Sequence, residues 1–185
     1  MKKGLKRIMT VVSLFALSGV FLISGCAGSA KTLDQSVKGP QIIVNPQTVR
    51  TGIARIMDTD IVFSGAGFRP DDSVFIELLD VPVKGEKRNI AIAEADVEKD
   101  GTFDAAVGTM TKISDFLRAS LGTNEKGENA PVITGPPMPP GIYTARAKSM
   151  LADRTAECPL EIKGPSPLDR IKDWLGVRMG KIIKK

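Results

Sequence analysis

Three carboxylates spaced two residues apart are the first candidates for chemistry in this chain. Asp96, Glu98 and Asp100 precede Gly101, a spacing that calcium-binding loops also use. An EF-hand loop would need a glutamate at its twelfth position, and that position is Val107. A strand end running into a turn explains the same residues, because Asp-Gly suits a two-residue turn between paired strands. We favour the hairpin turn and expect no metal or other cofactor.

Four further aspartates suggest a second acidic site. Asp58 and Asp60 precede a strand-like run, and Asp71 and Asp72 follow it. These side chains could meet at one end of the fold and bind a cation. Aspartate is also common in turns, because its side chain accepts hydrogen bonds from the nearby backbone. The residue types fit both interpretations equally well.

The residue types argue against an enzyme. The 185 residues include no histidine, the side chain most often used as a general base and as a metal ligand. A serine or cysteine nucleophile needs an adjacent base, and no lysine- or carboxylate-based motif supplies one. Cys158 falls on the inward face of a predicted strand, where cysteine behaves as a small apolar residue. We therefore expect a protein that is not an enzyme.

The N-terminus has the features of a secretory signal. Four cations lie within the first seven residues, and an apolar run follows from Ile8 to Ile23. That run of about 16 residues is short for crossing a bilayer. The segment Leu22-Ile23-Ser24-Gly25-Cys26 resembles the bacterial lipobox. The resemblance implies that residues 1–25 are a signal peptide and that Cys26 carries fatty acyl chains such as palmitate.

The residues after the cysteine predict where the protein goes and how it is held. Position 27 is Ala, not Asp, which by the same resemblance implies lipid attachment at the bacterial outer membrane. Residues 26–40 are mostly small and polar and predict a flexible tether. A chain of that length has a root-mean-square reach of roughly 20 Å.

The C-terminal segment, 164–185, predicts a basic amphipathic helix. Its apolar residues fall on one helical stripe, with Trp174 beside it, and a basic helix with tryptophan can lie in a membrane interface. The alternative is a helix docked on the domain, or a frayed end. The stripe comprises Leu168, Ile171, Leu175, Met179 and Ile182. The predicted membrane or partner contacts are Trp174, Lys172, Arg178, Lys181, Lys184 and Lys185.

Charge is distributed unevenly along the chain. The formal net charge is +5, but residues 26–163 hold 16 cations and 19 anions, whereas residues 164–185 hold six cations and two anions. A nucleic-acid-binding domain concentrates basic charge on a folded face. The acidic balance of the central region therefore gives no reason to expect nucleic acid as a partner.

The central region, 41–163, predicts an all-β domain of about seven strands. Residues 61–78 give a strand, a tight corner and a second strand, in which Val74, Ile76 and Leu78 face inward. Tyr143, Ala145 and Ala147 are expected to face inward on a later strand. On the last strand, Ala156, Cys158, Leu160 and Ile162 are expected to do the same, and Pro159 predicts an edge or a bulge.

One segment is expected to add an extended stretch to this pattern, and another is expected to depart from it. Residues 48–57 predict a further extended piece. Residues 110–121 have helical spacing, with Ile113, Phe116, Leu117 and Leu121 on one face and Gly122 as a C-cap. Residues 123–140 then predict a long loop, which is usually functional or disordered in a compact domain.

The region 41–163 resembles a bacterial immunoglobulin-like β-sandwich. The resemblance rests on the segments 65–74, 96–103 and 140–145, and it implies a tyrosine-corner role for Tyr143. The alternative for Tyr143 is an ordinary half-buried tyrosine. The resemblance also implies a non-catalytic envelope protein that binds a protein or glycan partner through its loops, with 110–140 as the variable surface. The alternative is a structural tether in which the C-terminal helix makes a second contact with membrane, lipopolysaccharide or cell wall.

Overall fold

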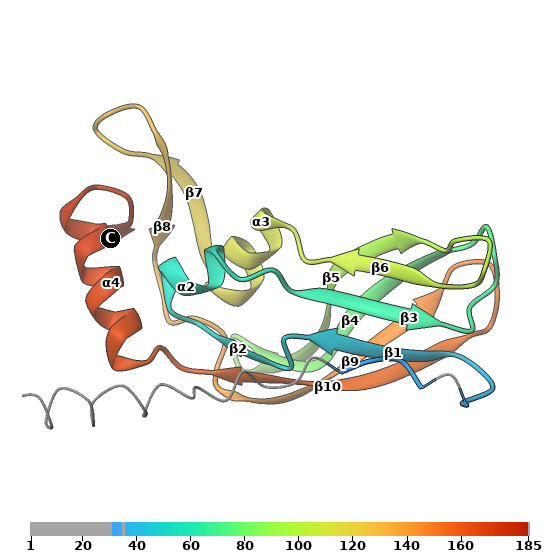
Figure 1. Cartoon of the computed structure of the whole chain (residues 1–185). Coiled ribbons are helices and arrows are strands. Elements are labelled where there is room, and N and C mark those ends of the chain that lie inside the picture. The colour runs from blue at the N-terminus through green and yellow to red at the C-terminus, as the bar shows by residue number, and fades with distance from the viewer. Residues whose placement is uncertain (1–30, 35, 185) are drawn as a thin grey trace, which may run out of the picture. The chain divides into compact units, whose positions relative to one another are not determined.

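The computed structural model describes residues 31–34 and 36–184 (Figure 1). The signal peptide expected at 1–25, Cys26 and Lys185 therefore lie outside the described residues. The described chain is mostly β, as the sequence predicts, but it holds eleven strands in three sheets where about seven strands were expected.

The largest sheet has five strands. Strands β10, β9, β4 and β5 are antiparallel neighbours, and β2 pairs parallel with the end of β10. In sheet order the strands are β2 (Thr48–Arg50), β10 (Thr155–Lys163), β9 (Gly141–Ser149), β4 (Ser73–Val83) and β5 (Glu86–Asp96).

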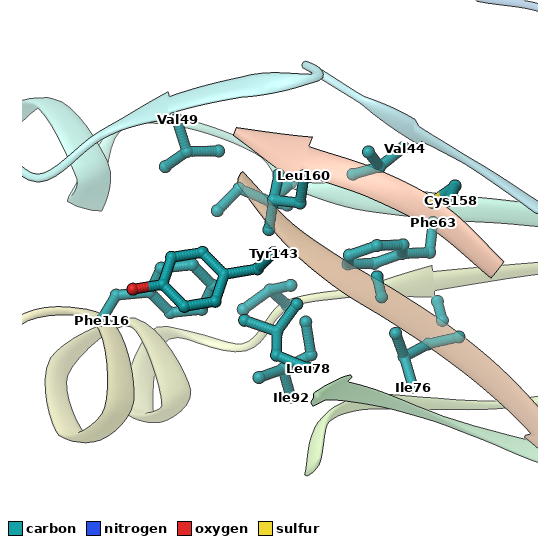
Figure 2. Packing of buried hydrophobic residues seen from close by; sticks show 14 of the residues in the cluster. Val44, Val49, Phe63, Ile76, Leu78, Ile92, Phe116, Tyr143, Cys158 and Leu160 are labelled. Carbon is teal, nitrogen blue, oxygen red and sulfur yellow. The ribbon is translucent and has the colours of Figure 1, made fainter. Parts of the chain in front are cut away.

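A second, antiparallel sheet has three strands and shares one core with the first. Its order is β1 (Gln41–Asn45), β3 (Val62–Ala66) and β6 (Phe103–Ala106). Figure 2 shows Val44 and Phe63 from this sheet lying among Ile76, Leu78 and Leu160 from the other. Burying this apolar surface is the main stabilising contribution to the fold.

The predicted inward faces are confirmed. Every residue expected to point inward on β4, β9 and β10 is buried, which is what a period of two residues produces when one face of a strand is covered. These residues are Val74, Ile76, Leu78, Tyr143, Ala145, Ala147, Ala156, Cys158, Leu160 and Ile162. Pro159 also lies where an edge was expected, because β2 pairs only with Glu161–Lys163 and leaves that side of Pro159 without a strand of this sheet.

The predicted corner is confirmed as strand, turn and strand, but its strands separate into different sheets. β3 belongs to the three-stranded sheet and β4 to the five-stranded sheet.

The Asp100-Gly101 turn also connects strands of different sheets. Gly101 has a φ of +81°, as a tight turn requires, but β5 before it and β6 after it do not pair. The hairpin expected there is wrong, because the turn connects the two sheets.

The third sheet occupies the region expected to be a helix and a long loop. A helical turn covers only α3 (Thr109–Thr111) and the π-helix η1 (Lys112–Phe116). The chain then turns at Arg118, with a φ of +50°, into β7 (Ala119–Thr123), which pairs with β8 (Asn129–Ile133). The prediction of a helix to Leu121 capped by Gly122, with a loop to 140, is therefore wrong.

Two further elements complete the fold. Residues 48–57, expected to be extended throughout, form β2 and then the helix α2 (Ile53–Met57). The C-terminal segment forms α4 (Pro167–Arg178), shorter than the helix expected over 164–185. Gly180, with a φ of +71°, then reverses the chain into β11 (Ile183–Lys184), which pairs parallel with β8. Ile182 is consequently buried in the core instead of extending the helical stripe.

Candidate functional site

Helix α4 begins at a well-defined cap. The Ser166 side chain accepts a hydrogen bond from the Asp169 N–H at 3.2 Å, and the Asp169 carboxylate accepts one from the Ser166 N–H at 2.8 Å. Pro167 occupies the first turn, where its missing N–H has no cost. Burial would raise the pKa of Asp169, but the hydrogen bonds from Ser166 outweigh it and hold the pKa below the ordinary value of 3.8. This reciprocal cap fixes where the helix starts.

The second acidic side chain of α4 fastens the helix to α2. The Asp173 carboxylate accepts hydrogen bonds from the Ile53 N–H at 3.0 Å and from the Ala54 N–H at 2.9 Å. The residue before α2, Gly52, supplies no side-chain cap of its own. Asp173 therefore satisfies donors that would otherwise have no partner at the start of α2.

Small residues allow α4 to approach the domain closely. A Cβ atom added to Gly52 would lie 2.6 Å from the Asp169 Cβ atom, and one added to Gly176 would lie 2.6 Å from the Ile182 Cδ1 atom. Both separations are well inside van der Waals contact. The fully buried residues of α4, which face the domain, are therefore two aspartates and a glycine.

As a result, most apolar side chains of α4 point away from the domain, the exception being Val177, which is partly buried against the core. Leu168 is 71% exposed, Trp174 57% and Ile171 55%. Leu175 and Met179 are also exposed, and together the five residues Leu168, Ile171, Trp174, Leu175 and Met179 form what we call the α4 apolar face. A helix packed on its own domain would normally bury such a stripe, so the usual orientation is reversed here.

The exposed charges on α4 itself have one sign. Both acidic residues of α4 are buried in its attachment to the domain, whereas its cations, Arg170, Lys172 and Arg178, are exposed. The Arg178 guanidinium carbon lies 5.2 Å from the centre of the Trp174 ring. Lys181 and Lys184 are exposed just beyond the helix. The α4 apolar face is therefore bordered by positive charge.

A shallow groove continues the α4 apolar face toward α2. It has a volume of about 420 Å³, and its apolar lining includes Ile53, Met57, Leu175 and Met179. Lys172, Lys181 and Asp58 lie at the same groove. Apolar lining with a few charged groups is typical of a surface that receives the apolar part of a ligand.

The predicted contact residues that the structure describes thus come together around α4, whereas the predicted apolar stripe loses one residue. Trp174, Lys172, Arg178, Lys181 and Lys184 are exposed within one region of the surface, and Lys185 lies outside the described residues. Ile182 leaves the stripe for the core. Sequence reasoning missed the docking roles of Asp169 and Asp173. The Ser-Pro-x-Asp pattern at 166–169 is a helix-start signal that could have located the first of them.

The two candidate acidic sites do not assemble among the described residues. Asp96 accepts a hydrogen bond from Ser73 at 2.8 Å, and Asp100 accepts one from the Thr102 N–H at 3.0 Å. Asp58 caps the C-terminus of α2, before β3 begins, whereas Asp72 comes after β3 has ended. The strand therefore separates the two aspartates. Within 31–34 and 36–184, no three acidic or cysteine side chains gather in a way that could hold a metal ion.

Cys158 lies in the core, as expected from the strand pattern. Burial raises the pKa of its thiol to about 11, although Lys31 acts weakly in the opposite direction. The thiol is therefore protonated at neutral pH and is a poor nucleophile.

A second exposed apolar feature lies at the opposite end of β10 from α4. Met150 and Leu151, in the turn between β9 and β10, are 64% and 70% exposed. Buried Asp72 holds this turn by accepting hydrogen bonds from the Ser149 hydroxyl and from the Leu151 N–H, the latter at 3.0 Å. The hydrogen bond from Ser149, opposed by burial, lowers the pKa of Asp72. The turn is therefore fixed while its two apolar side chains stay in solvent.

Comparisons with known proteins do not supply a family. No family model matches the chain, and no curated protein matches it. A β-glucosidase from Listeria innocua, in complex with isofagomine, has 10% identity and a TM-score of 0.34 over 71% of this chain and 17% of its own. The Pseudomonas fluorescens alkylpurine DNA glycosylase AlkC, bound to DNA containing an abasic site analogue, has 12% identity and a TM-score of 0.31 over 69% and 31%. This chain spans less than a third of either structure, and neither likeness bears on its activity.

Proposed function

We propose that this chain is a non-catalytic, lipid-anchored protein of the bacterial envelope that makes a second membrane contact through the α4 apolar face. The lipobox-like segment ending at Cys26 supports the anchor, and Ala27 supports the outer membrane as its location. The observation that carries the proposal is the docking of α4 by Asp169 and Asp173, which leaves only apolar and basic side chains exposed on the helix.

The chemistry of this surface suits an anionic bilayer. Exposed apolar side chains, including a tryptophan, can enter the boundary between head groups and acyl chains, and the surrounding cations attract anionic lipid. Among the described residues, no helix is sufficiently long and apolar to cross a bilayer. The proposed contact is therefore interfacial and adds to the anchor at Cys26.

The domain that carries this surface is proposed to be an immunoglobulin-like β-sandwich. Two sheets with a common core support this assignment. The Tyr143 hydroxyl donates a hydrogen bond to the Pro139 carbonyl, four residues upstream, at 2.8 Å, which is the bond that a tyrosine corner makes. The third sheet and α4 are additions to that pattern.

The test is binding of the non-lipidated mature chain, from Ala27, to vesicles. We expect it to sediment with vesicles containing phosphatidylglycerol at low salt, to be released at high salt, and not to bind neutral vesicles. Ile171→Asn should weaken binding about ten-fold, because it removes one of the inserting apolar side chains. The matched control is Ile142→Asn, since Ile142 is 76% exposed on β9. Equal binding by both variants would contradict the proposal.

A second candidate function is a binding module for a protein or glycan partner of the envelope. The fixed turn that presents Met150 and Leu151 favours it, because immobile exposed apolar side chains are typical of partner contacts. A photoreactive amino acid at position 151 should cross-link to one envelope partner in cells, whereas the same group at position 142 should not. Identical products from both positions would exclude this turn as the contact.

A further inference from the structure

The segment expected to be a flexible tether is partly fastened to the domain. The Lys31 N–H donates to the Asn45 side-chain oxygen, and the Asn45 amide donates back to the Lys31 carbonyl, both at 3.2 Å. Asp34 and the Gln41 side chain make a second reciprocal pair, at 3.0 and 2.8 Å. We call these four hydrogen bonds the N-terminal clasp. They hold the chain beside β1 in the way that a neighbouring strand would.

The N-terminal clasp sets how far the domain can lie from an anchor at Cys26. Only four residues lie between Cys26 and Lys31, and the five residue steps that join them extend no further than about 17 Å. Without the clasp, the first fixed residue would be Gln41, and the chain could extend to about 50 Å. The clasp therefore removes most of the reach that the sequence predicts for residues 26–40.

The Lys31–Asn45 pair of the N-terminal clasp also lies at the end of β1 that leads to α4. Asn45 ends β1, and only seven residues lie between it and Ile53, whose N–H donates to Asp173 of α4. Between them, the Arg50 side chain donates to the Gly164 carbonyl at 3.2 Å, just before α4 begins. Figure 1 shows β2 leading from the end of β1 to α2. The end of the chain that is attached to lipid and the α4 apolar face are thus connected by short, hydrogen-bonded segments.

From these observations we infer that the N-terminal clasp commits the α4 apolar face to the bilayer in which Cys26 is anchored, and not to a second surface across the envelope. The inference rests on the proposed function, since it takes both the anchor and the membrane contact as given. A short attachment makes the second contact intramolecular and raises its effective concentration. A weakly binding apolar face then remains on its own membrane, and its partner is the anionic lipid surrounding the anchor.

Trp174 supplies the probe for a direct test, because it is the only tryptophan in the chain and belongs to the α4 apolar face. Mature lipidated protein is reconstituted in vesicles of phosphatidylethanolamine and phosphatidylglycerol. Lipids with brominated acyl chains, which quench tryptophan, are placed either in these vesicles or in separate protein-free vesicles. We expect quenching in the first arrangement alone. Quenching by the separate vesicles, or by neither, overturns the inference.

Lengthening the attachment tests the role of the N-terminal clasp without altering the fold. An insertion of about ten glycine and serine residues after Ser29 triples the length between Cys26 and Lys31, which lowers the effective concentration about five-fold. At a salt concentration that half-releases Trp174, quenching within the same vesicle should fall accordingly. Asn45→Ala with Gln41→Ala should act in the same direction by opening the clasp. Quenching that is unchanged by the insertion overturns the inference.

The two proposals fail in different ways. If the non-lipidated chain does not bind anionic vesicles at any salt concentration, the proposed membrane contact is wrong and the inference falls with it. If that chain binds but the lipidated protein shows no quenching within its own vesicle, the membrane contact stands and only the inferred geometry is overturned.

Discussion

At the scale of single residues, two buried side chains, Cys158 and Asp72, show how burial and hydrogen bonding set the charge of a titratable group. Cys158 lies in the core, where loss of solvent raises the pKa of its thiol. Asp72 is also buried, but hydrogen bonds stabilise its charged form. The Cys158 thiol is thereby kept neutral and the Asp72 carboxyl ionised, and both side chains contribute to the fold.

The first prediction concerns the reactivity of Cys158. A pKa of about 11 in place of 9.0 lowers the fraction of reactive thiolate at neutral pH about a hundred-fold, and burial hinders access further. The non-lipidated chain from Ala27 contains no other cysteine. Its reaction with an aromatic disulfide reagent should be at least a hundred-fold slower when folded than in guanidinium. Equal rates would show that the β10 strand opens freely.

The second prediction concerns stability in acid. The pKa of Asp72 is lower in the folded protein than its ordinary value of 3.8. Its charged form therefore stabilises the fold above that pH, and the contribution is lost as pH falls from 3.8 through the folded value. Asp72→Asn should be less stable than the parent protein at neutral pH, and the difference should shrink toward pH 2. Urea unfolding at a series of pH values measures it, and a constant difference would contradict the assignment.

The residue scale also shows what the sequence could predict. Inward and outward positions on β9 and β10 follow from simple alternation, because each of these strands has one covered face. The contact residues around Trp174 were likewise visible as cations beside an apolar stripe. Asp173 was not predictable as a docking residue, because its partners are the Ile53 and Ala54 N–H groups, about 120 positions away in the chain.

At the scale of elements, the sequence predicted the positions of turns well, but it did not predict which strands pair. The Asp100-Gly101 turn forms, but whether its flanking strands pair depends on which sheet each joins. Residues 113–121 have helical spacing, but the last of them form a strand because β7 pairs with β8. In both cases the local signal was correct over a few residues, and a long-range pairing decided the rest.

The attachment of α4 to α2 gives the third prediction. Asp173→Ala leaves the N–H groups of Ile53 and Ala54 without their acceptors, which should lower the free energy of unfolding by about 2 kcal/mol. Asp153→Ala is the matched control, because Asp153 is exposed, and it should change stability by less than about 0.5 kcal/mol. Urea denaturation followed by circular dichroism measures both. Equal effects would show that α4 is not held by this carboxylate.

At the scale of the whole molecule, the sequence left open whether the basic C-terminal helix docks on the domain, and the structure shows that it does. Ile182 belongs to the core, β11 pairs with β8, and α4 completes the start of α2. The same segment carries the exposed apolar and basic side chains that we propose to contact the membrane. Its acidic residues and Ile182 hold it in place, and its exposed apolar and basic side chains are the ones that we propose to contact lipid.

The last prediction follows from this double role. Deleting residues 164–185 removes a buried isoleucine side chain, about 2 kcal/mol of apolar burial, and the acceptors for two N–H groups of α2, about another 2 kcal/mol. A domain whose total stability is about 5–15 kcal/mol should then unfold at clearly lower urea concentrations. Ile171→Asn, which changes only the exposed face, should leave the unfolding midpoint unchanged while weakening vesicle binding. A truncated chain as stable as the parent would mean that the C-terminal segment is a separate tail after all, and lost membrane binding in that chain could then be assigned to the segment directly.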